Sequence, residues 1–415
     1  MSNWNKILGP GILFAATAIG VSHLVQSTSA GALFGLSMIG FVALANILKF
    51  PFFEYGSRYA SATGHSLIEG YFRLSKWWLY LYLLITFFSM FFVTAAVGIV
   101  TIGFMENLFG LEDLTGIKKI THFILFGGGI LLLIFGRFDF MEKIVKVLGL
   151  TLLITTIISL IFTLIKGPAT TQTLFPDIGS AGWAFLIPLM GWMPTAIDLS
   201  TWNSLWTVEK IKQTNYHPTV KESVREFNFG YWISAALAFF FLIMGALLVY
   251  GTGKEVPGDG VAFSSFVISL YTESIGQWAS VIISVAAFSI MLSTFLTILD
   301  GYSRAVKTSF ELLKPTWKKG RVLEKLTVLI LGIGGLTLIL LFENNPNGFK
   351  LLVNTATTIS FIIAPVIAIL NFRLVMPDKI GKENSPRGFM RLLSYLGIIY
   401  LFAFLIWFVW FSYES

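Results

Sequence analysis

Two short polar stretches interrupt long apolar segments of this 415-residue chain, and they carry the side chains best suited to chemistry. The first stretch is Gly20–His23, followed by Gln26. The second is Gly191–Thr195, followed by Asp198. Imidazole, thioether, amide, hydroxyl and carboxylate groups in such stretches can bind an ion or a small polar solute.

These side chains have to be positioned by interrupted membrane helices. A helix can unwind at bilayer depth only where protein or a water-filled cavity satisfies the freed backbone groups. Two interrupted helices at corresponding points of the two halves of a chain indicate the substrate site of a secondary transporter. We therefore expect carbonyl groups near residues 18–20 and 190–192, including that of Met190, to face a common cavity.

The composition excludes a soluble protein and indicates an all-α integral membrane protein. The chain is 55% hydrophobic and only 12% charged, and long apolar runs predict spanning helices. We predict eleven spans, with helices one and six broken, at residues 8–35, 38–62, 77–108, 119–137, 141–166, 181–208, 225–251, 277–312, 322–342, 348–373 and 388–412.

The predicted spans make a single transmembrane domain over residues 1–415. The first ten divide into two groups of five, each opening with a broken helix, which is the pattern of an inverted repeat. The first repeat covers about 8–166 and the second about 181–373. The extra helix, about 388–412, is then peripheral.

The distribution of charge predicts the orientation. Most of the 29 Lys and Arg residues fall in loops on one side, which places the N-terminus in the cytoplasm and the C-terminus outside. The net charge of +7 is then explained without a nucleic-acid partner, and no obligate protein partner is indicated. The N-terminus is too short and too weakly basic for a cleavable signal. A bacterial-type inner membrane is the simplest location, and the absence of cysteine excludes thiolate metal sites.

Lys49 lies deep inside the second predicted span. A cation there costs on the order of 3 kcal/mol unless it is paired or hydrated, so we expect it to face the bundle interior or an aqueous cavity. It is either a structural counter-ion or a participant in transport. Asp198 is the one carboxylate near either break. It is either a site or coupling residue, or the buried partner of Lys49.

The motifs at the breaks resemble those of the NRAMP family of divalent metal-ion transporters. The resemblance rests on Gly9-Pro10-Gly11, on the run Ala30–Ser37 and on Met193-Pro194. It implies a LeuT-type fold, transport by alternating access, and a metal site between helices one and six. Metal is then the substrate, and no cofactor is implied.

The chain departs from the family pattern at the metal site. Gly20-Val21-Ser22-His23 stands where the family has Asp-Pro-Gly-Asn, so Gly20 replaces the metal-binding Asp and His23 the metal-binding Asn. Thr195 replaces the His of Met-Pro-His, while the Met193 thioether is kept. The acidic residues that the family uses in helix three for proton passage have no counterpart in residues 77–103. This chain therefore resembles a divergent branch, with weak or absent proton coupling.

Three classes of function follow from these residues. The first is transport of a divalent cation with His23 and Met193 as ligands, a nitrogen and sulfur set that suits zinc, iron or copper better than manganese. A hard ion such as Mg²⁺ would need oxygen ligands and retained waters. The second is transport of a small organic solute or anion, because the helix-one carboxylate is missing. The third, an intramembrane enzyme using His23 with Ser22 or Asp198, is disfavoured because no nucleophile motif is present.

Overall fold

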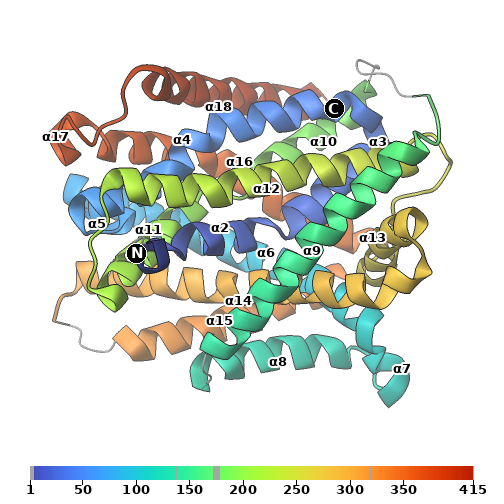
Figure 1. Ribbon diagram of the computed structural model, residues 1–415. Coiled ribbons are helices and arrows are strands. Elements are labelled where there is room, and N and C mark those ends of the chain that lie inside the picture. The colour runs from blue at the N-terminus through green and yellow to red at the C-terminus, as the bar shows by residue number, and fades with distance from the viewer. Residues whose placement is uncertain (1–3, 136–137, 172–177, 317–319, 415) are drawn as a thin grey trace.

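The computed structural model describes residues 4–135, 138–171, 178–316 and 320–414 of the chain. Within these residues every regular element is a helix, and most helices run along one common direction as a bundle (Figure 1). In this described part of the chain, eight helical segments are long and apolar enough to cross a membrane, and three further apolar helices are shorter. The count of eleven spans stays a prediction, and residues 136–137, at the end of the predicted span 119–137, lie outside the described part.

The elements of the first half follow the predicted spans closely. The interrupted first segment contains α2, a π-helix η1 and α3, and the second span is α4. In chain order the elements are α1 (Trp4–Ile7), α2 (Pro10–Ala18), η1 (Ser22–Ser27), α3 (Thr28–Phe34), η2 (Gly35–Met38), α4 (Ile39–Thr63), α5 (Leu67–Leu74), α6 (Lys76–Phe109), α7 (Leu111–Thr115), α8 (Ile120–Phe135) and α9 (Phe138–Lys166).

The second half also contains an interrupted segment, formed by α10 and α11. A further helix, α13, lies between α12 and α14. The elements are α10 (Gly179–Gly191), α11 (Leu199–Thr214), α12 (Val220–Leu248), α13 (Gly260–Ile275), η3 (Gln277–Ala279), α14 (Ser280–Leu313), α15 (Gly320–Phe342), α16 (Gly348–Leu374), α17 (Pro377–Ile380) and α18 (Gly388–Glu414).

Local sequence signals set several helix ends. Thr219 begins α12 with a capping box, in which its hydroxyl accepts from the Glu222 amide and the Glu222 carboxylate accepts from the Thr219 amide. Gly64 ends α4 and Gly110 ends α6, each in the left-handed conformation that glycine adopts at little cost. The helices therefore stop where turn residues permit the chain to change direction.

The two interrupted segments lie in the interior because neighbouring helices pack closely on them. Helix α12 packs against α2 and α3, α14 against α6, and α10 against α16. Backbones approach most closely where glycine is present: a Cβ on Gly31 of α3 would lie 1.9 Å from the Leu242 carbonyl oxygen of α12. A Cβ on Gly245 of α12 would in turn lie 2.4 Å from the Thr28 carbonyl oxygen of α3. Small residues thus allow α12 to hold the segment after the first break in place.

Candidate functional site

The first interruption is a short non-helical turn followed by a π-helix. Helix α2 ends at Ala18, Ile19 has non-helical torsions, and η1 then continues from Ser22 to Ser27. The fully unwound stretch is therefore shorter than the predicted Gly20–His23. A π-helix widens the helical turn and is frequent at functional sites, so the backbone around Gly20 is irregular even where it remains coiled.

Gly20 lies directly against α14. A Cβ at this position would be 2.9 Å from the Thr294 Cγ2 atom and 3.0 Å from its hydroxyl oxygen. The threonine hydroxyl donates to the Ala16 carbonyl at 3.2 Å and to its own helix at Ile290. The space that an aspartate at position 20 would need is therefore taken by Thr294. The close approach of α14 therefore leaves room for glycine at position 20 but not for an aspartate.

The second interruption is longer than predicted and is held by a lysine. Helix α10 ends at Gly191 and α11 begins at Leu199, so the non-helical stretch extends beyond the predicted Trp192–Thr195. The Lys49 ammonium of α4 donates hydrogen bonds to the carbonyl oxygens of Met190 and Gly191, both at 3.0 Å, and of Thr195 at 3.2 Å. The lysine is 1% exposed.

A small cavity lies between the two interruptions. It has a volume of about 20 Å³, enough for one water molecule or one small ion. Both breaks contribute to its wall, together with α6 and α14, and none of its lining residues carries a carboxylate or an imidazole. The lining residues are Thr17, Ala18, Val21, Ser22, Val93, Val97, Trp192, Thr195, Ala196, Leu199, Thr294 and Ile298. We call it the central cavity.

His23 does not line the central cavity and faces α12 instead. Its Nδ1 atom is 2.8 Å from the Ser22 hydroxyl, and its Nε2 atom is 2.8 Å from the Ser234 carbonyl oxygen. The ring is fully buried. Since a carbonyl only accepts, Nε2 donates to Ser234, and both ring nitrogens are engaged within the protein. The predicted role of His23 as a metal ligand requires the ring to leave these partners.

The two methionines of the second break are buried, and neither lines the central cavity. The Met190 thioether accepts a hydrogen bond from the Tyr400 hydroxyl at 3.0 Å, while its carbonyl binds Lys49. Met193 is completely buried. Like His23, it would have to move to contact an ion in the cavity.

Asp198 and Lys49 do not form an ion pair. The Asp198 carboxylate accepts from the Tyr302 hydroxyl of α14 at 3.1 Å, whereas the lysine is held by carbonyls. The two charges still interact electrostatically. Tyr302 and Thr294 were not identified as site residues from the sequence. Both are polar residues of the apolar helix α14, and this polarity could have indicated them.

Gln26 of η1 lines a second cavity, of about 100 Å³. Its amide donates to the Asn354 side chain of α16 at 3.4 Å, and both residues border the cavity. Of the predicted site residues, Thr195 therefore lines the central cavity and Gln26 a neighbouring one. Gly20 packs beside the central cavity.

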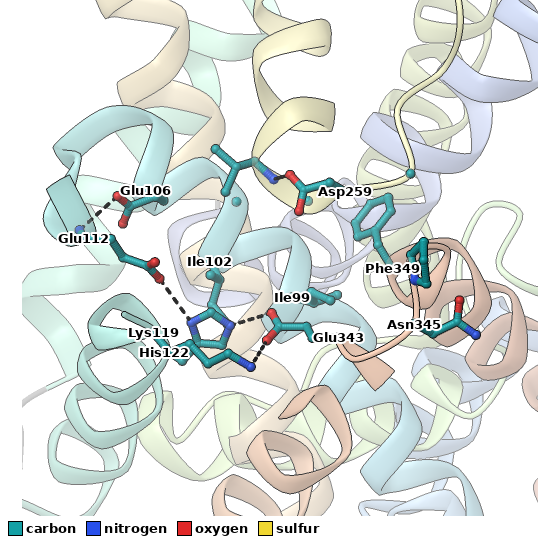
Figure 2. A pocket seen from close by; sticks show the side chains of 15 residues that line it. Ile99, Ile102, Glu106, Glu112, Lys119, His122, Asp259, Glu343, Asn345 and Phe349 are labelled. Atoms are coloured by element: carbon teal, nitrogen blue, oxygen red, sulfur yellow. Dashed lines mark hydrogen bonds and ion pairs between the residues drawn. The ribbon is translucent and has the colours of Figure 1, made fainter. Parts of the chain in front are cut away.

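A third cavity, of about 350 Å³, lies away from both breaks, near the end of α6 (Figure 2). His122 Nε2 is 2.6 Å from a Glu343 carboxylate oxygen, and Lys119 lies 2.9 Å from the other. Burial alone would raise the pKa of Glu343, but hydrogen bonds from His122 and Lys119 hold it below its usual range. Glu106, Glu112 and Asp259 also border this acidic cavity.

The acidic cavity is an ion-paired surface feature. Within the described ranges no group of three His, Cys, Asp or Glu residues could hold a metal ion. The Glu343 contacts join α8 to the connection between α15 and α16 (Figure 2). These ion pairs give the cluster a structural role, and the two breaks remain the candidate substrate site.

The start of α2 is tied to α12 by a carboxylate. Glu226 accepts from the Gly9 amide at 3.0 Å, and from the Gly11 amide at 3.0 Å and 2.9 Å through its two oxygens. Acidic groups are stabilised at a helix N-terminus, where free amide groups point outward. This contact fixes the half of the first broken helix that precedes the interruption.

Comparison with known proteins identifies the family of the chain. The family model for natural resistance-associated macrophage protein-like (Nramp) proteins matches residues 11–411. An uncharacterized protein of Pasteurella multocida (strain Pm70) is 31% identical over 418 residues, covering 98% of this chain and 93% of that protein.

Solved structures share the fold at low sequence identity. A mutant of the manganese transporter from Eremococcus coleocola is 15% identical, with a TM-score of 0.68 over 97% of this chain and 86% of that chain. MhsT in complex with L-phenylalanine is also 15% identical, with a TM-score of 0.63 over 95% and 98% of the respective chains. The chain belongs to the natural resistance-associated macrophage protein-like family of membrane transporters.

Proposed function

We propose that this Nramp-family transporter moves a divalent metal cation by alternating access through the central cavity. The observation that supports this proposal is that both interruptions, which are far apart in the sequence, border one cavity large enough for a small ion. The fold shared with the Eremococcus coleocola manganese transporter supports a metal substrate. The chain is not an enzyme, and metal is its proposed substrate, with no cofactor.

The cavity wall favours a harder metal than the sequence suggested. Ser22, Thr195 and Thr294, which carry hydroxyl groups, line the cavity, and we propose that carbonyls of the unwound backbone add further oxygen donors. Oxygen donors suit Mg²⁺ and Mn²⁺, which also retain water ligands. His23 and Met193 remain proposed ligands only for a state in which the breaks rearrange. We therefore propose Mn²⁺ or Mg²⁺ ahead of zinc or copper.

The orientation and location are proposed as the sequence predicted them: the N-terminus lies in the cytoplasm, the C-terminus outside, and the protein in the inner membrane. We also propose that transport is coupled weakly or not at all to protons. The Asp198 carboxylate is engaged by Tyr302 and lines none of the three cavities described above. It is retained as a proposed coupling residue, and Gly20, Gln26, Met190 and Thr195 as proposed substrate contacts.

A second candidate function is transport of a small organic solute or anion. The observation that favours it is electrostatic: no carboxylate lines the central cavity, and the Lys49 ammonium lies against its Thr195 wall. MhsT, which has the same fold, was solved with L-phenylalanine. The two candidates are separated by direct measurement of transport.

The test uses purified protein reconstituted in vesicles and offered Mn²⁺, Mg²⁺, Zn²⁺ and a panel of amino acids. We expect uptake of Mn²⁺ or Mg²⁺. Thr195→Val and Thr294→Val should each weaken apparent affinity by about 10–100-fold, the effect of one hydrogen-bonding group on a charged ligand. Thr337→Val on the exposed face of α15 is the matched control and should change nothing. Amino-acid uptake without metal uptake would establish the second candidate instead.

A further inference from the structure

The Lys49 side chain is fully satisfied by one short piece of backbone. An ammonium group has three N–H donors, and Lys49 directs hydrogen bonds to three carbonyl oxygens, those of Met190, Gly191 and Thr195, at 3.0–3.2 Å. All three acceptors lie at the second interruption, two at the end of α10 and one in the non-helical stretch after it, whereas Lys49 comes from the middle of α4. The Phe53 ring, 5.9 Å from the ammonium, adds a weak cation–π contact.

Such a carbonyl cluster attracts cations independently of the lysine. The last carbonyls of a helix have no partner within it and carry the negative end of the helix dipole. Met190 and Gly191 are the last two residues of α10. In membrane proteins, clustered carbonyls replace the hydration shell of a bound ion, and unwound helix ends coordinate coupling cations.

The carbonyl cluster adjoins the central cavity. Thr195 belongs to both, since its carbonyl accepts from Lys49 and the residue lines the cavity wall. A carboxylate is not what holds the lysine, because Asp198 is bound to Tyr302. The ammonium of Lys49 therefore occupies the position, on the three carbonyls, that a cation would take if it bound at the second break.

We propose that the carbonyls of Met190, Gly191 and Thr195 form a cation site whose resident ligand is the tethered primary ammonium of Lys49. A transported cation that uses these carbonyls has to displace the lysine, so Lys49 is an intramolecular competitor that sets the affinity for substrate. The existence of the site rests on the contacts above. The competition with substrate rests on the proposed function.

The site is tested by removing the tether and supplying the amine separately. Lys49→Ala deletes the side chain beyond Cβ, and n-propylammonium is the fragment removed. We expect the variant in lipid nanodiscs to melt several degrees below wild type and n-propylammonium to restore most of the loss. Tetramethylammonium has the same charge but no N–H donor, so it should not restore stability. Equal effects of the two ions, or no loss in the variant, would overturn the site.

Lys350→Ala is the matched control. Lys350 also donates to a backbone carbonyl, that of Val256 at 2.9 Å, but it is exposed to solvent. We expect little loss of stability and no rescue by amine. If Lys49→Ala can be purified only when n-propylammonium is present during expression, the site is supported. If it stays unfolded with amine while Lys49→Met is as stable as wild type, the site is refuted.

The competition is tested with Lys49→Met, which shortens the side chain by one heavy atom and removes the charge. Calorimetry should show Mn²⁺ binding tighter than in wild type by about tenfold or more, because a like charge in a low-dielectric site has been removed. Lys49→Arg retains the charge and should not tighten binding. Weaker or unchanged Mn²⁺ binding in Lys49→Met would refute the competition. If neither protein binds metal, the proposed function fails and the amine rescue still decides the site.

Discussion

Gly191→Ala adds one methyl group where α10 and α16 approach most closely. The new Cβ would lie 2.0 Å from the Thr357 carbonyl oxygen and 2.8 Å from its carbon. These are backbone atoms, so α10 and α16 have to separate by roughly 1 Å in a tightly packed interior. The Gly191 carbonyl, which accepts from Lys49 at 3.0 Å, would then pass beyond the usual hydrogen-bond limit of about 3.2 Å.

The cost of this substitution has two parts. Overpacking a core with a methyl group costs about 1–3 kcal/mol, and loss of a hydrogen bond to a charged group costs about 1.5–3 kcal/mol. We therefore expect the free energy of unfolding to fall by about 2.5–6 kcal/mol, measured by denaturant titration in lipid-containing micelles. Transport should fall with it, because the carbonyl cluster is displaced.

Gly127→Ala is the matched control for this prediction. Gly127 lies in α8, and a Cβ there would have nothing within 4 Å. Replacing a helical glycine by alanine at an open position should leave stability unchanged or raise it by up to about 1 kcal/mol. A Gly191→Ala variant that is as stable as Gly127→Ala and transports normally would show that α10 does not pack closely on α16 at the break.

Three further predictions concern the first break, the start of α2 and the acidic cavity. Gly20→Asp combined with Thr294→Ala places a carboxylate at the first break and makes room for it. Calorimetry should therefore show a divalent-metal affinity about 10–100-fold above that of Thr294→Ala alone; no gain over that variant would mean that position 20 does not face the ion. Glu226→Gln removes the charge that binds the start of α2, and we expect about 1–2 kcal/mol less stability and faster proteolysis at residues 4–9; an unchanged cleavage rate would contradict this anchor. Glu343→Gln should destabilise the protein by a constant amount at neutral pH. Burial raises the pKa of the Glu343 carboxyl group, but the contacts with His122 and Lys119 outweigh it and hold the pKa below its ordinary value of 4.5. That difference from wild type should shrink as the pH falls below about 4.5, where the unfolded carboxyl group becomes protonated; a difference that persists at pH 3 would refute the ion-pair account.

The helices could be predicted because hydropathy is a local property of the sequence. The spans predicted at 348–373 and 322–342 correspond to α16 (Gly348–Leu374) and α15 (Gly320–Phe342). The interruptions also lie near their predicted positions, since glycine, proline and polar residues disturb an apolar helix locally. The π-helix after Gly20 was not predicted, because its hydrogen-bond pattern depends on the packing of α12 and α14 around it.

The partners of the buried polar residues could not be predicted, because they come from distant parts of the chain. Lys49 was expected to be either a structural counter-ion or a participant in transport. The structure places its ammonium on three carbonyls and not on a carboxylate, and its part in transport stays a prediction. His23 turns toward Ser234 of α12, more than two hundred residues away in sequence. Spacing along the chain indicates which residues are near a break but not which way their side chains point.

The central claim is that the transported ion binds between the two breaks, and anomalous X-ray scattering from crystals equilibrated with Mn²⁺ tests it most directly. We expect an anomalous peak in the central cavity, next to Ser22, Thr195 and Thr294. The peak should weaken in crystals of Thr195→Val. A structure at saturating Mn²⁺ with no peak there, or with a peak only beside Glu343 and His122 in the acidic cavity, would contradict the claim.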